Sequence, residues 1–335
     1  MKILVVSSYP PRHCGIGTYA HDQVAHLRAQ GHVVTVLSPP DGDGQIRAPF
    51  LGGRAFLQAG LIGGGFDRIV VHFQPALYYR PRRPVSKVTT SLGLLALSMA
   101  RGPRLEVVVH EADEPRRWRP DFVLLRAALA RAGRISFHTG AEWEALERAY
   151  HVEVRGAIIT HQVEVTSGLS REEARAALNL GDAEGPVFVC AGFLQPSKGY
   201  ERAVDAFEAA RTNGARLYIV GSVRDRTPEN TTYARGLARR AGEVPGVRFV
   251  DRFLSGDEFD RWVVAADWVV LPYRRSWSSG VLARAQALGT PAIVAAVGGL
   301  PEQAGERDMV FDDDEGLRAA LVRAAASGTA DGGRP

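Results

Sequence analysis

The stretch PVFVCAGFLQPSKGYERAVDAF, residues 186–207, shows the pattern that decides the fold of this chain. Its first part is a continuous apolar run that predicts a buried strand, and the residues after Gly199 predict an amphipathic helix. The loop between them ends in Lys198, one of only three lysines in the chain. A compact cation at the entrance of a helix suits a phosphate group, although a solvated surface lysine is the alternative.

The same alternation of apolar strand and helix extends in both directions from this stretch. Continuous apolar strands that alternate with helices are typical of a parallel sheet covered on both faces. The other runs are KILVVSS, HVVTVLS, DRIVVHF, LEVVVHE and GRISFHT before the stretch, and ARLYIVG, VRFVDRF, DWVVLPY and PAIVAAV after it. The predicted fold class is therefore α/β, with two Rossmann-like, doubly wound sheets.

The series is interrupted near residues 163–186, which carry no strand signal and end in Gly/Pro punctuation. We predict an N-terminal Rossmann-like domain at residues 1–166, a linker at 167–184, a C-terminal Rossmann-like domain at 185–325 and a flexible tail at 326–335. Ligands of such folds bind outside the carboxyl ends of the strands, so a central cleft between the two domains is the expected site.

The composition fits two ordinary globular domains, with 335 residues, 45% hydrophobic and 23% charged. A net charge of +4 suits an anionic ligand or surface but is too small to indicate nucleic acid. Cys14 and Cys190 lie far apart and lack metal-ligand spacing, so a reducing, cytoplasmic location is expected. The N-terminus enters a strand without a signal-peptide core, and no apolar run reaches the length of a membrane span.

A glycine loop follows the first strand, in the segment YPPRHCGIGTYA at residues 9–20. Gly15, Gly17 and Ala20 match the dinucleotide pattern G-x-G-x-x-A, but YPPRHC separates the pattern from the strand. The second strand also ends at Ser38 instead of at an acidic residue that would bind a ribose. An NAD(P)-dependent enzyme and a plain flexible loop are therefore both alternatives to an anion-binding loop, which would use the free N–H groups of the helix start.

The segment from Trp268 to Pro301 contains no Asp or Glu, although it contains three arginines. Two serines precede a predicted helix there, so backbone N–H groups at the helix start could bind an anion, with Arg274 and Arg275 at the rim. The N–H groups concerned belong to Ser278, Ser279, Gly280, Val281 and Leu282. An ordinary serine-capped helix is the alternative.

The chain resembles the GT-B-fold retaining glycosyltransferases of family 4, also called glycosyl transferases group 1. The resemblance is carried by SYPPRHCGIGTYA, VVVHEAD, GFLQPSKGYERAVDAF, ARLYIVG, VRFVDRFLSGDEFDRWVVAADWVVLPY and SGVLARAQALGTPAIVAAVGGLPE. It is strong in the second half and looser at residues 40–105. It implies a retaining hexosyltransferase that moves a sugar from a nucleotide-sugar, such as a UDP-sugar or GDP-mannose, to a saccharide, a lipid-linked saccharide or a small molecule. No cofactor besides this donor substrate is implied, and no metal.

The resemblance also implies roles for individual residues. His110 matches the histidine that approaches the donor sugar, and His110 and Lys198 are the expected catalytic residues. The donor diphosphate is expected at Gly15, Gly17, Lys198, Ser279, Gly280, Val281 and Leu282, and the base at Arg252 and Phe253. His110 and His72 could instead be hydrogen-bonded wall residues, and His161 resembles the family's linker histidine and is expected to pack the hinge.

Three positions depart from the family pattern. The family has two glutamates eight positions apart, near the donor sugar and the ribose, and Ser276 and Arg284 occupy these positions here. Phe193 takes the place at which many relatives have an arginine that contacts the diphosphate. A homologue that binds a nucleotide-sugar without turnover is therefore an alternative to an active transferase. Arg284 could also form an internal salt bridge, with Asp267 or with an acid beyond Pro301.

Two basic-aromatic loops, YYRPRRP at residues 78–84 and PRRWRP at 115–120, follow predicted strands of the first domain. By the resemblance this domain receives the acceptor. We therefore expect an anionic acceptor or a peripheral contact with an anionic membrane. Ordinary loops of an arginine-rich soluble protein are the alternative.

Overall fold

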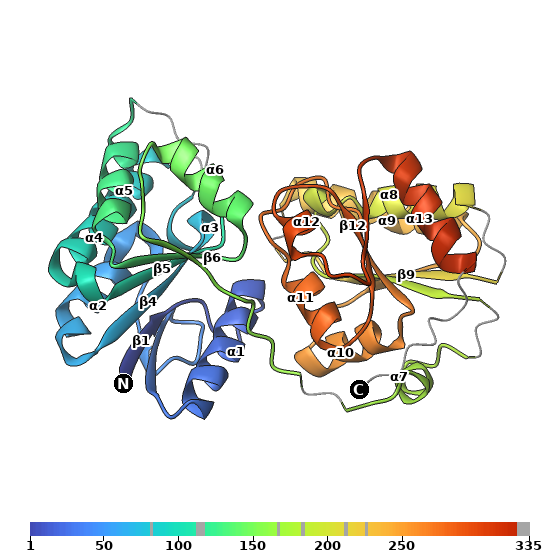
Figure 1. Ribbon diagram of the computed structural model, residues 1–335, viewed down its shortest axis with the longest axis horizontal. Coiled ribbons are helices and arrows are strands. Elements are labelled where there is room, and N and C mark those ends of the chain that lie inside the picture. The colour runs from blue at the N-terminus through green and yellow to red at the C-terminus, as the bar shows by residue number, and fades with distance from the viewer. Residues whose placement is uncertain are drawn as a thin grey trace. The chain divides into compact units, whose positions relative to one another are not determined.

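The computed structural model describes residues 1–80, 83–111, 118–165, 168–181, 185–210, 214–224 and 227–326. The chain divides into two compact units, Met1–Glu164 and Val165–Pro335, and each contains its own sheet (Figure 1). As predicted, both sheets are parallel throughout and flanked by helices. Of the predicted tail at 326–335, only Ala326 belongs to the described residues.

The first unit is built on a seven-stranded sheet whose inner strands are the continuous apolar runs of the sequence. The strand order is β3 (Ile46–Arg47), β2 (Val33–Ser38), β1 (Lys2–Val6), β4 (Arg68–Phe73), β5 (Leu105–Val109), β6 (Arg134–Phe137) and β7 (Gly156–Ile158). The order reverses between β1 and β4, which makes this pair the switch point at which such sheets bind ligands.

Helices cover both faces of this sheet. Three of them, α2 (Arg54–Ile62), α4 (Pro84–Arg101) and α5 (Pro120–Arg131), bury apolar side chains against one face. On the opposite face α1 (Gly15–Ala29) packs against a separate apolar cluster (Figure 1). Shorter elements are α3 (Pro75–Tyr78), α6 (Gly140–Tyr150), η1 (Leu51–Gly53), η2 (Gly63–Gly65) and η3 (Gly102–Arg104). No helix in the described ranges combines the length and the apolarity needed to cross a membrane.

The second unit has a six-stranded sheet with its own core. The strand order is β10 (Val247–Asp251), β9 (Arg216–Gly221), β8 (Val187–Ala191), β11 (Trp268–Leu271), β12 (Ala292–Ala295) and β13 (Met309–Phe311). The helices are α7 (Arg171–Ala177), α8 (Tyr200–Ala210), α9 (Pro228–Glu243), α10 (Gly256–Ala265), α11 (Gly280–Ala287), α12 (Leu300–Gln303) and α13 (Asp314–Ala326). The order reverses between β8 and β11, so the opening stretch of the sequence lies at the switch point.

The predicted linker at 167–184 contains α7, which packs against α10 of the second unit. Its anchor is Asp267, a fully buried carboxylate that accepts from Arg171 at 3.0 Å and from Arg175 at 2.7 Å. Asp267 also accepts from the Val187 N–H at 2.7 Å, at the start of β8. Buried charges are stable only when paired, so this network joins α7 to the core. The Ser170–Glu173 capping box, a local sequence signal, marks the start of this helix.

Candidate functional site

The candidate ligand site of the second unit lies at the carboxyl ends of β8 and β11. The loop after β8 ends in Lys198 within η4 (Pro196–Lys198), and Gly199 follows with a positive φ of 59°. A Cβ atom on Gly199 would lie 2.4 Å from the carbonyl oxygen of Pro272, in the loop after β11. The N–H of Arg274 also donates to the carbonyl of Ser197 at 2.9 Å. The two loops are therefore held together by backbone contacts that only glycine permits.

Replacing Gly199 by alanine should destabilise the second unit by about 1–3 kcal/mol and displace Lys198, because the new methyl group meets a carbonyl at a left-handed backbone position. Chemical unfolding of the full chain measures the first effect. The matched control is Gly236→Ala in α9, where an added Cβ has no neighbour within 4 Å and alanine should be neutral or stabilising. Equal stability of the two variants would contradict this description of the loop.

The Lys198 ammonium group is stabilised without being neutralised. Its Nζ lies 3.7 Å from the ring centroid of the buried Tyr273, a cation–π contact. Among the described residues no carboxylate pairs with Lys198. The charge is therefore available to an anion at the switch point.

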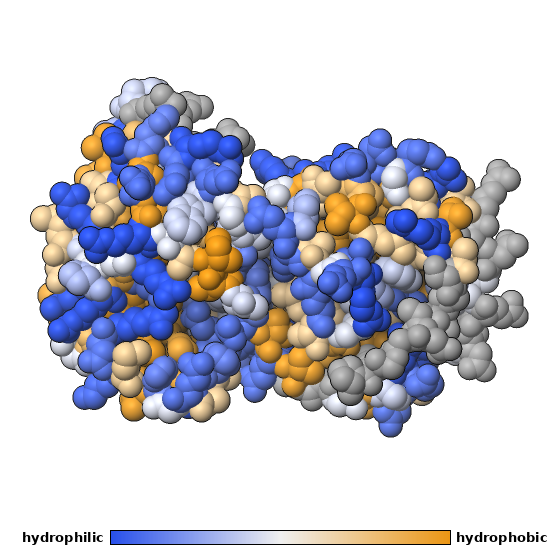
Figure 2. Space-filling view, in the orientation of Figure 1, coloured by the Kyte–Doolittle hydropathy of each residue, from blue (hydrophilic) through white to orange (hydrophobic). Residues whose placement is uncertain are grey.

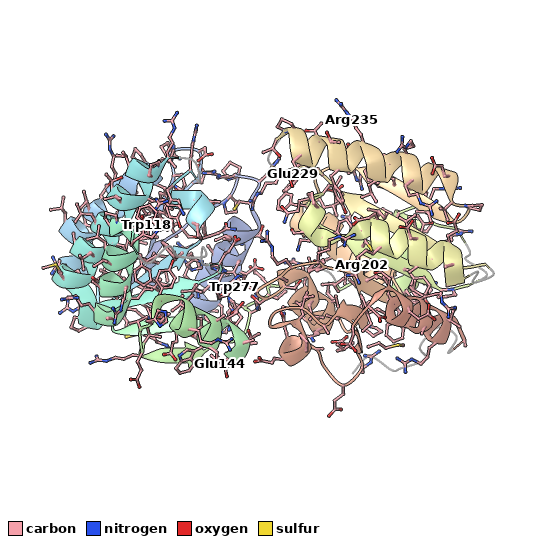
Figure 3. The ribbon with its side chains drawn as sticks, turned by 90° about the horizontal axis from the view of Figure 1, so that it is seen from above. Trp118, Glu144, Arg202, Glu229, Arg235 and Trp277 are labelled. Atoms are coloured by element: carbon pink, nitrogen blue, oxygen red, sulfur yellow. The ribbon has the colours of Figure 1, made fainter. Side chains whose placement is uncertain are left out.

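The arginines near this loop are mostly bound to protein groups. Arg274 donates to Glu201 through Nε at 3.0 Å and Nη2 at 2.7 Å, which neutralises its charge. Arg202 extends from α8 (Figure 3) and donates to the carbonyl of Pro272 at 3.0 Å. Arg275 is exposed and has no ion pair within the described ranges. Of the two arginines predicted at the rim, Arg275 alone keeps an available charge.

The predicted N–H groups at the start of α11 are only partly available. The Ser279 side chain caps the helix by accepting from the Leu282 N–H at 3.2 Å, and the Ser279 N–H donates to Gln303 Oε1 at 2.8 Å. Gly280 and Val281 occupy the first helical positions, so their N–H groups have no acceptor within the helix. Of the five predicted N–H groups, those of Ser279 and Leu282 are therefore occupied and those of Ser278, Gly280 and Val281 stay available, and the serine cap is also present.

Ser276 and Arg284, the two departures from the glutamate pattern, differ in their surroundings. Ser276 Oγ donates to the carbonyl of Ser278 at 2.9 Å and is partly buried within the loop. Arg284 is only 8% exposed and forms an ion pair with the fully buried Asp260 of α10. Its Nη2 donates to Asp260 Oδ2 at 3.1 Å, and its Nε binds the other oxygen. The internal salt bridge thus exists, but its partner is neither Asp267 nor an acid beyond Pro301.

The residues predicted to hold the base lie at the end of β10. The Arg252 N–H donates to the carbonyl of Gly221 at 2.8 Å, and its side chain lies 3.3 Å from Glu258. Phe253 is 38% exposed, with its ring centroid 6.4 Å from that of Phe193. The two rings form an apolar surface at the carboxyl edge of the sheet, which could stack a planar group.

The first unit gathers four histidines around one tyrosine. His72 lies in β4, and His110, His138 and His161 follow β5, β6 and β7. Their ring centroids lie 5.0–5.5 Å from that of Tyr19, a buried residue of α1. The cluster occupies the carboxyl edge of the sheet, where the parallel strands bring these side chains together.

Hydrogen bonds define the tautomers of two of these imidazoles. His72 Nε2 lies 2.9 Å from Gln23 Oε1, an acceptor, so this nitrogen carries the hydrogen. His72 Nδ1 is then an acceptor, and His110 Nε2, 3.2 Å away, must donate to it. His110 consequently presents an unprotonated Nδ1, and Gln23 and His72 hold its ring in place.

Burial keeps the imidazoles of the cluster neutral. It lowers the pKa of His72 and of His161 to about 3 each, helped by the nearby His138. It lowers the pKa of His138 to about 4 against the opposing hydrogen bond to the Ile159 carbonyl. Burial and then the neighbouring imidazoles lower the pKa of His110 well below its ordinary value. Near pH 7 the cluster can therefore exchange hydrogen bonds with a ligand without carrying charge.

The glycine loop of the first unit opens α1 without a side-chain cap at Cys14. Gly15 is exposed, and the N–H groups of Gly15, Ile16 and Gly17 lie in the first turn and have no acceptor within the helix. This loop and the histidine cluster belong to Met1–Glu164, whereas Lys198, Phe253 and the start of α11 belong to the second unit. The predicted site residues thus fall into two groups, each at the carboxyl edge of its own sheet.

Gln23, Tyr19 and His138 were not predicted as members of the first group. A signal was present: a histidine stands at the end of, or just after, four successive strands, in VVHF, VVVHE, SFHT and ITHQ. Of the predicted acceptor loops at 78–84 and 115–120, residues 81–82 and 115–117 lie outside the described part of the chain.

One group of side chains within the described ranges could share a metal ion. One ring nitrogen of His21 and one carboxylate oxygen from each of Asp22 and Glu164 lie within 4.8 Å of one another. His21 and Glu164 are exposed, and proximity of such groups does not define a metal site. The absence of a metal from the reaction stays a prediction.

The fold of this chain is similar to that of solved structures. Sucrose-phosphate synthase from Thermosynechococcus elongatus superposes with a TM-score of 0.70 at 20% identity, covering 97% of this chain and 90% of that one. Anabaena HepE in complex with UDP gives a TM-score of 0.70 at 16% identity, covering 98% and 90%. The two parallel α/β units are those of the GT-B fold, as predicted.

The second comparison concerns sequence families. Residues 185–327 match the family described as glycosyl transferases group 1. A D-inositol 3-phosphate glycosyltransferase from Jonesia denitrificans is 30% identical over 215 residues, which are 61% of this chain and 49% of the relative. The chain thus spans about half the length of this relative and of a second one, from Actinosynnema mirum.

Proposed function

We propose that this protein is a glycosyltransferase whose second unit binds the diphosphate of a nucleotide-sugar. The observation that carries the proposal is Lys198, a cation without a carboxylate partner in the described ranges, held at the switch point of the sheet. The family match of residues 185–327 and the UDP bound by HepE support it. The donor sugar and the base are left open.

In the proposed reaction the chain acts mainly by stabilising charge. As the glycosidic bond to the diphosphate breaks, negative charge grows on the leaving phosphate oxygen. Lys198 Nζ and the N–H groups of Gly280 and Val281 would bind that charge, and Arg275 would add a longer-range attraction. His110, neutral and oriented by His72, would accept one hydrogen bond from a sugar hydroxyl through its unprotonated Nδ1. We propose retention of the anomeric configuration on the resemblance alone.

Two further features of the proposal concern the substrates. The Phe193–Phe253 surface would take the base, with Arg224 above the Phe193 ring at 5.6 Å. The acceptor would be anionic and bind the first unit. The name of the Jonesia relative, which acts on an inositol phosphate, is consistent with that class of acceptor.

A protein that binds the nucleotide-sugar without turnover is the second candidate. Both glutamate positions are replaced, and Arg284 is committed to Asp260 within the core. One hydrogen bond to a charged group contributes about 1.5–3 kcal/mol, so the loss of these carboxylates weakens donor binding without removing the charge stabilisation at the diphosphate.

A thermal-shift panel of UDP, GDP, ADP, their sugars and NAD distinguishes these possibilities, followed by donor hydrolysis with any ligand that binds. We expect stabilisation by at least one nucleoside diphosphate and none by NAD, together with slow donor hydrolysis. Binding without hydrolysis or transfer would favour the second candidate. Stabilisation by NAD alone would contradict both candidate functions. It would indicate instead that the glycine loop at residues 15–20 binds a dinucleotide.

A further inference from the structure

The first unit has an exposed apolar surface on two neighbouring helices that the proposed function does not use. On α4, Val85, Leu92 and Met99 recur every seven residues and therefore lie on one face of the helix. On α2 and the turn before it, Leu51, Leu57 and Leu61 are also exposed. These six side chains, the α2–α4 face, are between 46% and 83% exposed.

Close backbone packing arranges these side chains as one surface. A Cβ atom on Gly53 would lie 2.6 Å from the carbonyl oxygen of Thr89, and one on Gly93 would lie 2.7 Å from the carbonyl oxygen of Gly53. At the other end, Arg101 Nε donates to the carbonyl of Gly60 at 3.2 Å. The helices therefore run side by side in the same direction. This register sets Leu57 and Leu61 beside the second half of α4, so the exposed leucines of α2 and the exposed apolar side chains of α4 lie on neighbouring helices.

The charges around this surface are of one sign. Neither α2 nor α4 contains Asp or Glu, while Arg54 and Arg83 are exposed at their starts. On α5, which packs beside α4, Val123 and Arg126 are exposed. The one acid of α5, Asp121, binds Arg119 at 2.7 Å.

An apolar surface bordered by cations and free of carboxylates matches the headgroup region of an anionic bilayer. Apolar side chains enter the boundary between headgroups and acyl chains, and arginines attract anionic lipids. In Figure 2 apolar and hydrophilic side chains are mixed over the visible face. A larger apolar surface usually marks an interaction site.

We infer that the α2–α4 face docks on the surface of an anionic membrane. Trp118, labelled in Figure 3, is a further exposed apolar side chain, 80% exposed just before α5. Docking would bring the carboxyl edge of the sheet, with its histidine cluster, near the lipid headgroups. The inference rests on exposure and charge and is independent of the proposed activity.

Vesicle flotation of the full-length chain tests the inference. We compare phosphatidylcholine vesicles with vesicles that also contain phosphatidylglycerol, at low and high salt. The wild-type chain should float with the anionic vesicles and detach at high salt. The double variant Leu61→Glu/Met99→Glu should bind about tenfold more weakly or worse, and Arg54→Gln and Arg126→Gln about fivefold each. All these positions are exposed, so folding should be unaffected, as far-ultraviolet circular dichroism would check.

The matched control is Val322→Glu on α13 of the second unit, an exposed valine outside the face, which should leave flotation unchanged. Flotation that does not depend on anionic lipid, or that survives the double variant, would overturn the inference. So would a double variant that converts a dimer to a monomer in sedimentation velocity without changing flotation, because the face would then be a contact between copies of this chain.

Discussion

At pH 5, residues 1–164 should lose amide hydrogen-exchange protection well before residues 168–326. All nine histidines of the chain precede residue 162, so the second unit contains none. His72 and His138, with pKa values of about 3 and about 4, resist protonation in the folded unit, whereas the unfolded chain takes up protons below about pH 6.5. Stability is therefore complete above pH 6.5 and is lost as the pH falls toward the folded pKa values.

The expected size of this effect is large. At pH 5 each of these two buried imidazoles should reduce the free energy of unfolding of the first unit by about 2 kcal/mol, a value limited by the ordinary histidine pKa. His110 and His161 act in the same direction. Exchange mass spectrometry of the full chain at pH 7.5 and 5, corrected for the intrinsic exchange rate, measures both units in one sample.

One substitution measures the contribution of a single histidine of the cluster to the acid-induced loss of stability. His138→Asn keeps a donor for the Ile159 carbonyl but cannot be protonated, so the acid-induced loss should shrink by about 2 kcal/mol. His151→Asn is the control, because His151 is exposed and its left-handed backbone tolerates asparagine. Equal acid sensitivity of the two units would show that the histidine cluster is not buried as described.

Replacing Asp260 by leucine should destabilise the second unit by about 3–5 kcal/mol. The substitution removes the carboxylate that binds Arg284 through two nitrogen atoms, in a site where Asp260 is fully buried. The double variant Asp260→Leu/Arg284→Met should recover most of this loss, because an apolar pair can replace a buried ion pair at little cost. Urea unfolding of the four proteins in this cycle gives the coupling energy.

An exposed ion-pair network supplies the comparison. Arg240 binds Asp205 at 2.8 Å and Glu208 at 2.5 Å on the surface, so Arg240→Gln should change stability by about 1 kcal/mol or less. If Asp260→Leu destabilises the second unit no more than Arg240→Gln does, the Asp260–Arg284 pair is not the buried core pair described above. The double variant should also keep its affinity for nucleoside diphosphates. A loss of affinity would indicate that Arg284 contacts the ribose of the donor, as the glutamate at this position does in the family.

The fold could be predicted from the sequence because its inner strands are continuous apolar runs, which leave little ambiguity of class. Lys198 and its glycine could be placed at a strand end for the same reason. The ion pair of Arg284 could not be predicted from the sequence, because Asp260 lies 24 positions earlier on another helix. Only the packing of α10 beside α11 brings the two residues together. Because the segment from Trp268 to Pro301 contains no acid, its sequence favours an anionic ligand for its arginines. In the structure Arg284 instead forms a buried ion pair with Asp260.

The histidine cluster could not be predicted from the sequence for a different reason. Each of its members has an ordinary local context, a histidine near a strand end, and the interpretation as a wall residue is adequate for each alone. Their grouping depends on the order of β4, β5, β6 and β7 in the sheet and on Tyr19 and Gln23 from α1. A strand order is a property of the whole unit, which single-segment patterns do not contain.

The central claim is that Lys198 binds the donor diphosphate, and isothermal titration with the preferred nucleoside diphosphate tests it most directly. Lys198→Met should weaken binding by about 10- to 150-fold, the contribution of one hydrogen bond to a charged group, while affinity for the nucleoside alone stays the same. Lys87→Met is the matched control, since Lys87 also lies over a tyrosine ring, that of Tyr79 in the first unit, at 4.9 Å. Its affinity should equal that of the wild type. Unchanged diphosphate affinity in Lys198→Met would contradict the account.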